Sequence, residues 1–323
     1  MERGFWKKLR KPIFALAPMA NVTDTAFRRL IARHGKSGVM WTEFVSADGL
    51  CSAGKRALLP DLAFSPAERP IVAQFFGANP DHFYQVAKLA RKLGFDGVDI
   101  NMGCPDRAVV RQGAGAALMK NPELAKRIIL AAKQGAGPLP VSVKTRIGDR
   151  ANTLKEWIPE LLEAEPAALI FHARTWKDLS LVPARWDAIR EAVRIVRKRS
   201  DRKNRPLVLG NGDVSSLPEA RARVRETGAD GVMIGRGVFG NPWFFNSRRR
   251  RAPDRSERLA ALSEHIQLFN RLLGKKKNFD VMKKHFKAYV SGFNGAKELR
   301  IALMDTDDAA TALGLIRRFR GRD

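Results

Sequence analysis

The 323-residue sequence has little cysteine and no long apolar run. Its two cysteines, Cys51 and Cys104, lie far apart, so their spacing matches neither a disulfide framework nor a metal-ligand motif. No segment approaches the roughly 18 apolar residues that a transmembrane helix needs, and the basic N-terminus has no export signal. We therefore expect a cytoplasmic protein with reduced thiols, no metal centre and no membrane association.

Acidic side chains are also scarce relative to basic ones. The sequence has 59 Lys and Arg against 33 Asp and Glu, which gives a formal net charge of +26. An excess of this size attracts a polyanion over a Debye length, and no clear basic amphipathic helix indicates membrane-surface binding. Nucleic acid is the expected partner, and a generic basic surface is the alternative interpretation.

Short apolar segments alternate with helical patterns along most of the chain. Apolar spacing of three and four predicts intervening helices, and eightfold strand–helix alternation is typical of a (β/α)₈ TIM barrel, an α/β fold. A doubly wound sheet is the alternative, but residues 17–20 read APMA where that fold usually has a glycine-rich phosphate loop. The expected strands occupy residues 13–17, 39–42, 71–75, 97–101, 141–145, 168–172, 207–210 and 231–234.

The sequence changes character after residue 246. Residues 247–254 form a charged, proline-containing segment, and the remainder has helical spacing without a strand candidate. We expect a barrel domain over 1–246 and a small all-helical domain over 252–323. Basic residues of the second domain alternate with aromatic ones, a pattern that fits either an RNA-binding face or the core of a small bundle.

Polar and small residues follow the expected strands, at the ends where parallel barrels hold their active sites. Gly103 and Pro105 turn the chain around Cys104, which favours an accessible thiol. The loops at 211–213 and 235–237 predict a phosphate site, because small residues let backbone N–H groups approach an anion.

Three side chains in this set favour a ligand over a purely structural role. Lys144 needs either an anionic ligand, such as a reduced flavin ring, or an ion pair with Asp99 or Glu43. Gln74 carries both a donor and an acceptor, which suits the edge of a pyrimidine-type ring, and a hydrogen bond to neighbouring backbone is the alternative. His172 is interpreted as facing a ligand, although a satisfied core histidine is the alternative.

As a set, these motifs resemble the dihydrouridine synthases, flavin enzymes that reduce uridine in tRNA. The resemblance also extends into the helical tail, at residues 284–289 and 292–300. In chain order the shared segments are APMANVTD at 17–24, DINMGCP at 99–105, GAG at 113–115, VKTR at 143–146, HART at 172–175, NGD at 211–213 and GRGVFGNPW at 235–243.

The resemblance implies a monomeric, FMN-bound barrel followed by a helical RNA-binding domain. It implies Cys104 as the proton donor and Asn101 as the residue that holds the target uracil, and we expect Arg174 to contact substrate. NADPH, or NADH, would reduce the flavin in the same pocket. The implied flavin contacts are Pro18, Met19, Ala20, Gln74, Lys144, His172, Asn211, Gly212, Asp213, Gly235 and Arg236.

The implied chemistry agrees with the residues present. Saturating the uracil C5–C6 bond needs a hydride at C6 and a proton at C5. A thiol with an ordinary pKa near 8.5 is mostly protonated at neutral pH and can supply that proton. A base stacked inside folded RNA must first be extruded into the pocket.

Several features differ from the pattern that is usual in the family, so the sequence does not define which RNA is the substrate. The loop at 106–112 has fewer lysines than is usual in the family, Gly237 stands where alanine is common, and residues 179–186 and 248–251 are unusual. Ribosomal RNA is therefore an alternative substrate, and the uridine position is not defined. Two other functions are alternatives: a flavin barrel that reduces a small molecule, and a flavin-retaining RNA chaperone.

Overall fold

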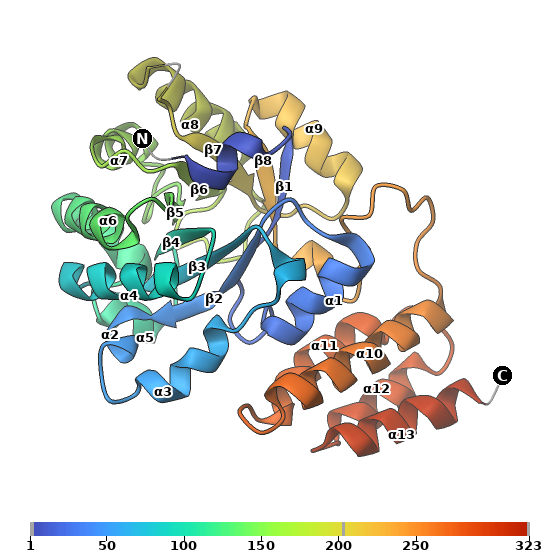
Figure 1. Cartoon of the computed structure of the whole chain (residues 1–323). Helices are drawn as coiled ribbons and strands as arrows, with labels where there is room; N and C mark the ends of the chain where they lie inside the picture. The colour runs from blue at the N-terminus through green and yellow to red at the C-terminus, as the bar shows by residue number, and fades with distance from the viewer. Residues whose placement is uncertain (1–2, 202–203, 322–323) are drawn as a thin grey trace.

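The computed structural model describes residues 3–201 and 204–321. Eight parallel strands form one sheet in the order β1-β8-β7-β6-β5-β4-β3-β2, and a bridge between Ala15 and Val39 joins its two ends. The (β/α)₈ fold expected from the sequence is confirmed (Figure 1). The strands are β1 Ile13–Leu16, β2 Met40–Ser46, β3 Ile71–Phe76, β4 Gly97–Met102, β5 Val141–Arg146, β6 Ala168–His172, β7 Leu207–Asn211 and β8 Gly231–Ile234.

Helices connect the strands and cover the outside of the barrel (Figure 1). Several begin at polar caps: the side chains of Asn79, Asn121 and Ser216 accept backbone N–H groups of the first helical turns. The barrel helices are α1 Thr25–Gly35, α2 Ala47–Leu50, α3 Lys55–Leu58, α4 Pro80–Lys92, α5 Arg107–Arg111, α6 Pro122–Ala136, α7 Leu154–Glu163, α8 Trp186–Arg199 and α9 Leu217–Thr227. Short 3₁₀ turns are η1 Gly4–Lys8, η2 Leu59–Leu62, η3 Pro66–Glu68, η4 Gly115–Lys120 and η5 Arg236–Val238.

Apolar side chains on the two faces of the strands form separate layers. The larger layer packs the outward faces against the helices, and the smaller one fills the barrel interior. The interior layer includes Ala15, Trp41, Val72, Ile170, Leu209 and Met233, with Trp6 of η1 beside it. Because this layer fills the barrel, closely packed apolar side chains lie beneath the polar residues at the C-terminal strand ends.

The C-terminal residues form the helices α10 Arg255–Leu273, α11 Lys283–Tyr289, α12 Ala296–Met304 and α13 Ala309–Arg320, with the 3₁₀ turn η6 Phe279–Met282. Figure 1 places them in orange and red beside α1. Their apolar cluster includes Phe279, Phe286 and Tyr289, so these aromatics are core residues. The same cluster takes in Ala26 and Leu30 of α1. The apolar packing thus crosses the expected domain boundary, and the division at 246 and 252 stays a prediction.

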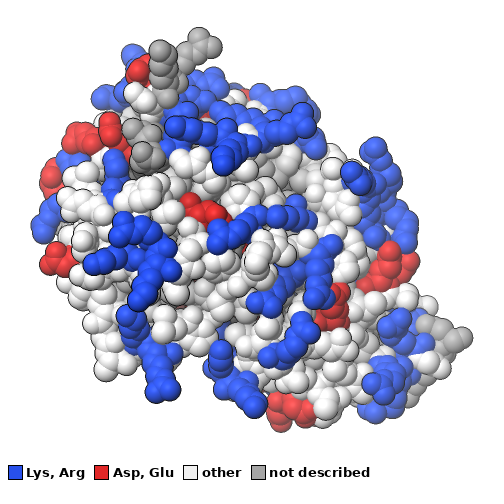
Figure 2. All heavy atoms as spheres, viewed as in Figure 1, with Lys and Arg blue, Asp and Glu red and all other residues white. Residues whose placement is uncertain are grey.

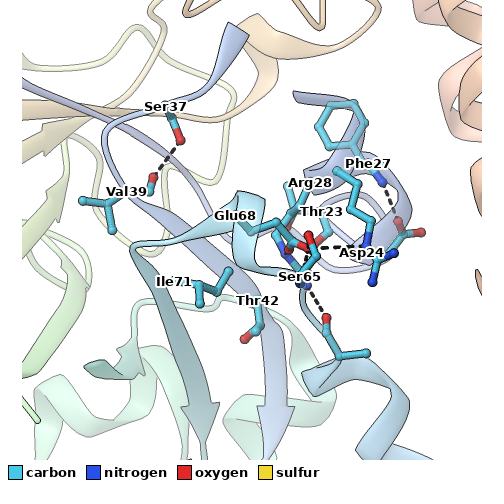
Figure 3. A network of polar contacts seen from close by, with 12 residues as sticks. Thr23, Asp24, Phe27, Arg28, Ser37, Val39, Thr42, Ser65, Glu68 and Ile71 are labelled. Carbon is cyan, nitrogen blue, oxygen red and sulfur yellow. Dashed lines mark hydrogen bonds and ion pairs between the residues drawn. The ribbon is translucent and has the colours of Figure 1, made fainter. Parts of the chain in front are cut away.

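A buried ion pair fixes α1 on the barrel (Figure 3). Arg28 is fully buried, and its Nε donates to Glu68 Oε2 at 2.7 Å. Its remaining nitrogens donate to the carbonyl oxygens of Thr23 at 2.7 Å and Ala63 at 2.6 Å. A buried guanidinium with these hydrogen bonds made is costly to disturb, so α1 offers α10 a fixed surface.

Membrane spans and metal sites are both absent from the described residues, 3–201 and 204–321. No helix there is both long enough and apolar enough to cross a lipid bilayer. Within the same ranges, His, Cys, Asp and Glu side chains do not gather in threes or more as a metal site would require.

Candidate active site

A cavity of about 560 Å³ lies at the C-terminal ends of the strands. Its volume is within the range of roughly 300–1,000 Å³ typical of ligand sites. Ala20, Gln74 and Arg174, which the sequence also predicted for this site, are outside the lining. The predicted residues that do line it are Pro18, Met19, Asn101, Cys104, Lys144, His172, Asn211, Gly212, Asp213, Gly235 and Arg236.

Asn101 at the end of β4 shapes the loop that carries Cys104. Its Oδ1 accepts the backbone N–H groups of Gly103 at 3.1 Å and Cys104 at 2.9 Å. Gly115 packs beneath this loop with a positive φ of 60°, and a Cβ at that position would lie 2.8 Å from the Cys104 carbonyl oxygen. The thiol is thereby held in the cavity wall, half-buried.

The thiol of Cys104 is stabilised in its protonated form. Burial raises its pKa above the ordinary value, although a hydrogen bond from the Asp106 backbone lowers it. The Asp106 carboxylate adds to the rise, and Arg146 and Lys144 oppose it more weakly. Cys104 can therefore hold a proton at neutral pH and deliver it to a group in the cavity.

Gln74, Asp99 and Ser142 form a chain of hydrogen-bonded side chains behind Asn101. Gln74 is fully buried: its Nε2 donates to Asp99 Oδ2 at 2.6 Å, and its Oε1 accepts from Asn101 Nδ2 at 3.1 Å. Ser142 also donates to Asp99. Gln74 lies outside the cavity lining and is fully buried, so it acts on the cavity through Asn101 rather than by direct contact. Burial raises the pKa of Asp99 to about 6.

Lys144 brings to the cavity a buried cation that the Asp99 carboxylate compensates only in part. Burial, together with the neighbouring Arg146 guanidinium, lowers its pKa to about 8. Within the described ranges its Nζ makes no hydrogen bond or ion pair, because Asp99 is taken by Gln74 and Ser142, and Glu43 bonds elsewhere. An ammonium group in this state favours an anionic ligand.

Arg146 is a site residue that the sequence reasoning did not assign. Its Nε donates to the Gly103 carbonyl at 2.7 Å and its Nη1 to the Thr175 carbonyl at 3.0 Å, so it joins the loops after β4 and β6. His172 lies nearby on the wall. Burial and then the charges of Lys144 and Arg146 hold the His172 pKa well below its usual value, which leaves a neutral imidazole.

The loops after β7 and β8 form a cradle of small residues and paired charges. Gly212 has a positive φ of 141°, and a Cβ there would lie 2.8 Å from the Ala184 Cβ. A Cβ at Gly237 would lie only 2.2 Å from the Val214 carbonyl oxygen, so the alanine expected at that position does not fit this loop. Arg236 Nη2 donates to Asp213 Oδ1 at 2.7 Å.

Arg174 is placed behind this cradle rather than in the cavity. It is 2% exposed, donates to Asp213 Oδ2, and its Nε bonds the Val182 carbonyl at 2.6 Å. Two guanidinium groups, those of Arg174 and Arg236, therefore share the Asp213 carboxylate. The side chain that could meet a ligand is Arg236, which is exposed at the rim.

A parallel barrel with a polar cavity at the C-terminal strand ends, a protonated thiol and an unpaired lysine defines an enzyme of the (β/α)₈ class. The chain belongs to the dihydrouridine synthase family, whose model matches residues 15–319. It is 38% identical to a Staphylococcus aureus (strain COL) protein named probable tRNA-dihydrouridine synthase, over all of this chain and 97% of that one. It is 36% identical to probable tRNA-dihydrouridine synthase 2 of Bacillus subtilis (strain 168), over 99% of this chain and 97% of the relative.

Solved structures of much lower identity share the fold. Histamine dehydrogenase from Rhizobium sp. 4-9 superposes with a TM-score of 0.53 at 14% identity, over 79% of this chain and 49% of that one. A 2-naphthoyl-CoA reductase complex gives a TM-score of 0.57 at 12% identity, over 73% and 49%. This chain spans about half the length of these two proteins. At such identities the likeness supports the barrel alone.

Proposed function

We propose that this chain is a tRNA-dihydrouridine synthase that uses FMN to reduce the C5–C6 double bond of uridines in tRNA. Its family and the names of its full-length relatives support this assignment. The observation that carries it is the pairing, in one cavity, of a protonated Cys104 thiol with the partner-free Lys144 ammonium. We further propose a monomer that works in the cytoplasm.

The cavity fits FMN on three grounds. Its volume suits a cofactor of that size. The small residues Gly212 and Gly235, with Arg236 at the rim, would hold the phosphate, and the negative charge of Asp213 beside them is already compensated by two arginines. Lys144 would meet the part of the ring that becomes anionic on reduction. Pro18, Met19, His172 and Asn211 would complete the flavin contacts.

FMN held in this cavity would supply, in its reduced form, the hydride for uracil C6. Cys104 then gives its proton to C5, and its raised pKa keeps that proton available at neutral pH. The thiolate left behind lies near the cations of Arg146 and Lys144, which stabilise it. Asn101 directs Cys104 through the two backbone hydrogen bonds of the loop, and we retain for it the role of holding the uracil.

The charge of the chain suits an RNA substrate. Figure 2 shows Lys and Arg side chains over both the barrel and the helical part of the face in view. These cations can hold the RNA backbone while the target base leaves its stack and enters the cavity. NADPH, or NADH, is the proposed donor that reduces the flavin.

The proposal is tested with purified protein, FMN, NADPH and unmodified tRNA. We expect flavin absorption bands that persist after gel filtration, and a mass gain of two hydrogens at particular uridines in site-mapped nucleoside mass spectrometry. Protein that stays colourless after soaking in FMN would contradict the flavin assignment. Reduction of free enones or orotate-type compounds without reduction of tRNA would instead support the small-molecule alternative.

A further inference from the structure

Three consecutive lysines, residues 275–277, follow α10 and belong to the surface that the sequence suggested for RNA. The structure separates them: Lys275 and Lys276 are exposed, whereas the Lys277 side chain is only 16% exposed and turns inward. Its Nζ lies 2.7 Å from Glu43 Oε2 and 2.8 Å from Asp61 Oδ1. Lys277 therefore joins the helical region to β2 and η2 of the barrel.

Glu43 connects this lysine to the wall of the active-site cavity. Its second oxygen, Oε1, accepts the backbone N–H of Asn21, which lies in the same turn as the cavity-lining Pro18 and Met19. Asn21 adopts a positive φ of 55°, a conformation that non-glycine residues rarely adopt without support. The Glu43 carboxylate thus fixes the end of the turn at 18–21.

Lys277 is also the cation that balances the buried Glu43 carboxylate and the partly buried Asp61 carboxylate. Burial alone would lower its pKa, but Glu43 and Asp61 raise it above the ordinary value, so the ammonium stays charged. Burial raises the pKa of the Asp24 carboxyl to about 6, and both members of the pair act on it as well: Glu43 raises its pKa and Lys277 lowers it. Without the lysine, Glu43 becomes a buried carboxylate without a counter-ion, an arrangement that is strongly unfavourable.

We propose that Lys277 is a positioning residue that couples the seating of the helical region to the active-site turn at residues 18–21, through Glu43. Its role is to neutralise Glu43 and keep that carboxylate on the Asn21 N–H, and not to bind RNA phosphates. This inference rests on the proposed function, because the turn is assigned there to the flavin.

The test compares Lys277→Met with Lys276→Met, since the two lysines are neighbours and only one is buried. For Lys277→Met we expect at least a tenfold rise in the FMN dissociation constant of flavin-stripped protein, together with a lower kcat. The slope of log affinity for tRNA against log salt should stay at the wild-type value. For Lys276→Met we expect unchanged FMN affinity. An unchanged FMN affinity or a shallower salt slope in Lys277→Met would contradict the proposal.

Two further variants separate charge from packing. Lys277→Arg keeps the cation and should retain FMN affinity close to wild type. The double variant Glu43→Gln/Lys277→Met removes both charges, while the amide oxygen of the introduced glutamine can still accept the Asn21 N–H, so FMN affinity should recover to within about threefold of wild type. These two variants also decide the matter if Lys277→Met alone does not fold. A double variant as weak as Lys277→Met would overturn the role of charge.

Failure of the proposed function is distinguishable from failure of this coupling. Wild-type protein that neither binds FMN nor reduces tRNA would end the proposed function. In that case the coupling is measured in flavin-free protein. There Lys277→Met should lower the midpoint of thermal unfolding and speed proteolytic cleavage within residues 247–254. The double variant should restore both readouts. Equal midpoints and equal proteolysis of wild type and Lys277→Met would refute the coupling.

Discussion

The barrel mouth and the helical region use their residues differently. At the mouth, side chains from several strands are held individually by named partners, as Asn101 and Arg146 show. In the helical region Phe279, Phe286 and Tyr289 are buried together, and most of the cations, Lys277 excepted, lie toward the outside. Residues 1–251 carry 44 Lys and Arg against 24 Asp and Glu, and residues 252–323 carry 15 against 9. The net charges are +20 and +6, which is nearly the same positive charge per residue, so both regions can contribute to the attraction of a polyanion.

The largest effect should come from the cysteine of the mouth. Replacing Cys104 by Ala removes the proposed proton donor and should lower the turnover of tRNA by about 10²-fold or more, with FMN and tRNA affinities unchanged. Cys51 is exposed and lies outside the cavity lining, so Cys51→Ala is the matched control and should keep wild-type turnover. Comparable losses in both variants would break the assignment of the chemistry to the mouth.

The second-largest effect should come from Lys144, through the affinity for the flavin. Lys144 is charged below its pKa of about 8 and neutral above it, so the affinity for an anionic flavin should fall as pH rises through that value. Lys144→Met should weaken FMN binding by roughly tenfold at neutral pH and abolish this pH dependence. Lys120, which pairs with Asp149 and lies outside the lining, supplies the control Lys120→Met. Anaerobic binding of reduced FMN, followed by its absorption at several pH values, measures both effects.

A smaller effect sharpens the comparison of charge between the two regions. Lys275/Lys276→Gln removes two exposed cations of the helical region, and Arg248/Arg250→Gln removes two exposed cations of the linker. Each pair should reduce the slope of log tRNA affinity against log salt by roughly 0.7–0.9 for every phosphate that is no longer neutralised. If only the helical pair changes the slope, RNA binding is confined to the helical region, contrary to the expectation from the charges of the two regions.

The smallest effect concerns stability where the two regions meet. His285 is buried against Phe27 of α1 and His265 of α10, near Lys284, and burial lowers its pKa from 6.5 to about 3. The unfolded chain then binds the proton first as pH falls, so stability is lost from about pH 6.5 downward, by at most ~1.4 kcal/mol per pH unit. His285→Phe should make this loss shallower. Thermal unfolding of wild type and His285→Phe at a series of pH values measures this difference. If both proteins lose stability equally as pH falls, the imidazole is not buried in solution.

Much of the fold follows from sequence patterns because strands and helices have local signals. Asn-Pro and Ser-Leu-Pro starts mark helices that the structure contains, and each expected strand is present. Residues 47–62 were missed: α2, α3 and η2 are each a single short turn, without enough residues to show a period. β2 runs four residues beyond its expected end because a bulge between Trp41 and Phe44 keeps it paired.

The site was only partly predictable, because the pairing of side chains depends on register. β3 and β4 align so that Gln74 lies opposite Asp99, which occupies the amide that the sequence suggested for a ring edge. Arg174 is captured by Asp213, a residue 39 positions later. Lys277 looked like its two exposed neighbours until the fold placed Glu43 and Asp61 beside it. Sequence patterns indicate residue types at a mouth but not which of them pair with each other.

The most direct test of the central claim is the single-turnover rate of uridine reduction by enzyme whose flavin is reduced beforehand, measured across pH with site-mapped nucleoside mass spectrometry. We expect the wild-type rate to decline at high pH, above the ordinary thiol pKa of about 8.5, in a step separate from any change near pH 8 caused by Lys144. Cys104→Ala should be at least about 100-fold slower and show no such decline. A Cys104→Ala rate within about threefold of wild type, or the same alkaline decline in that variant, would contradict proton delivery by this thiol.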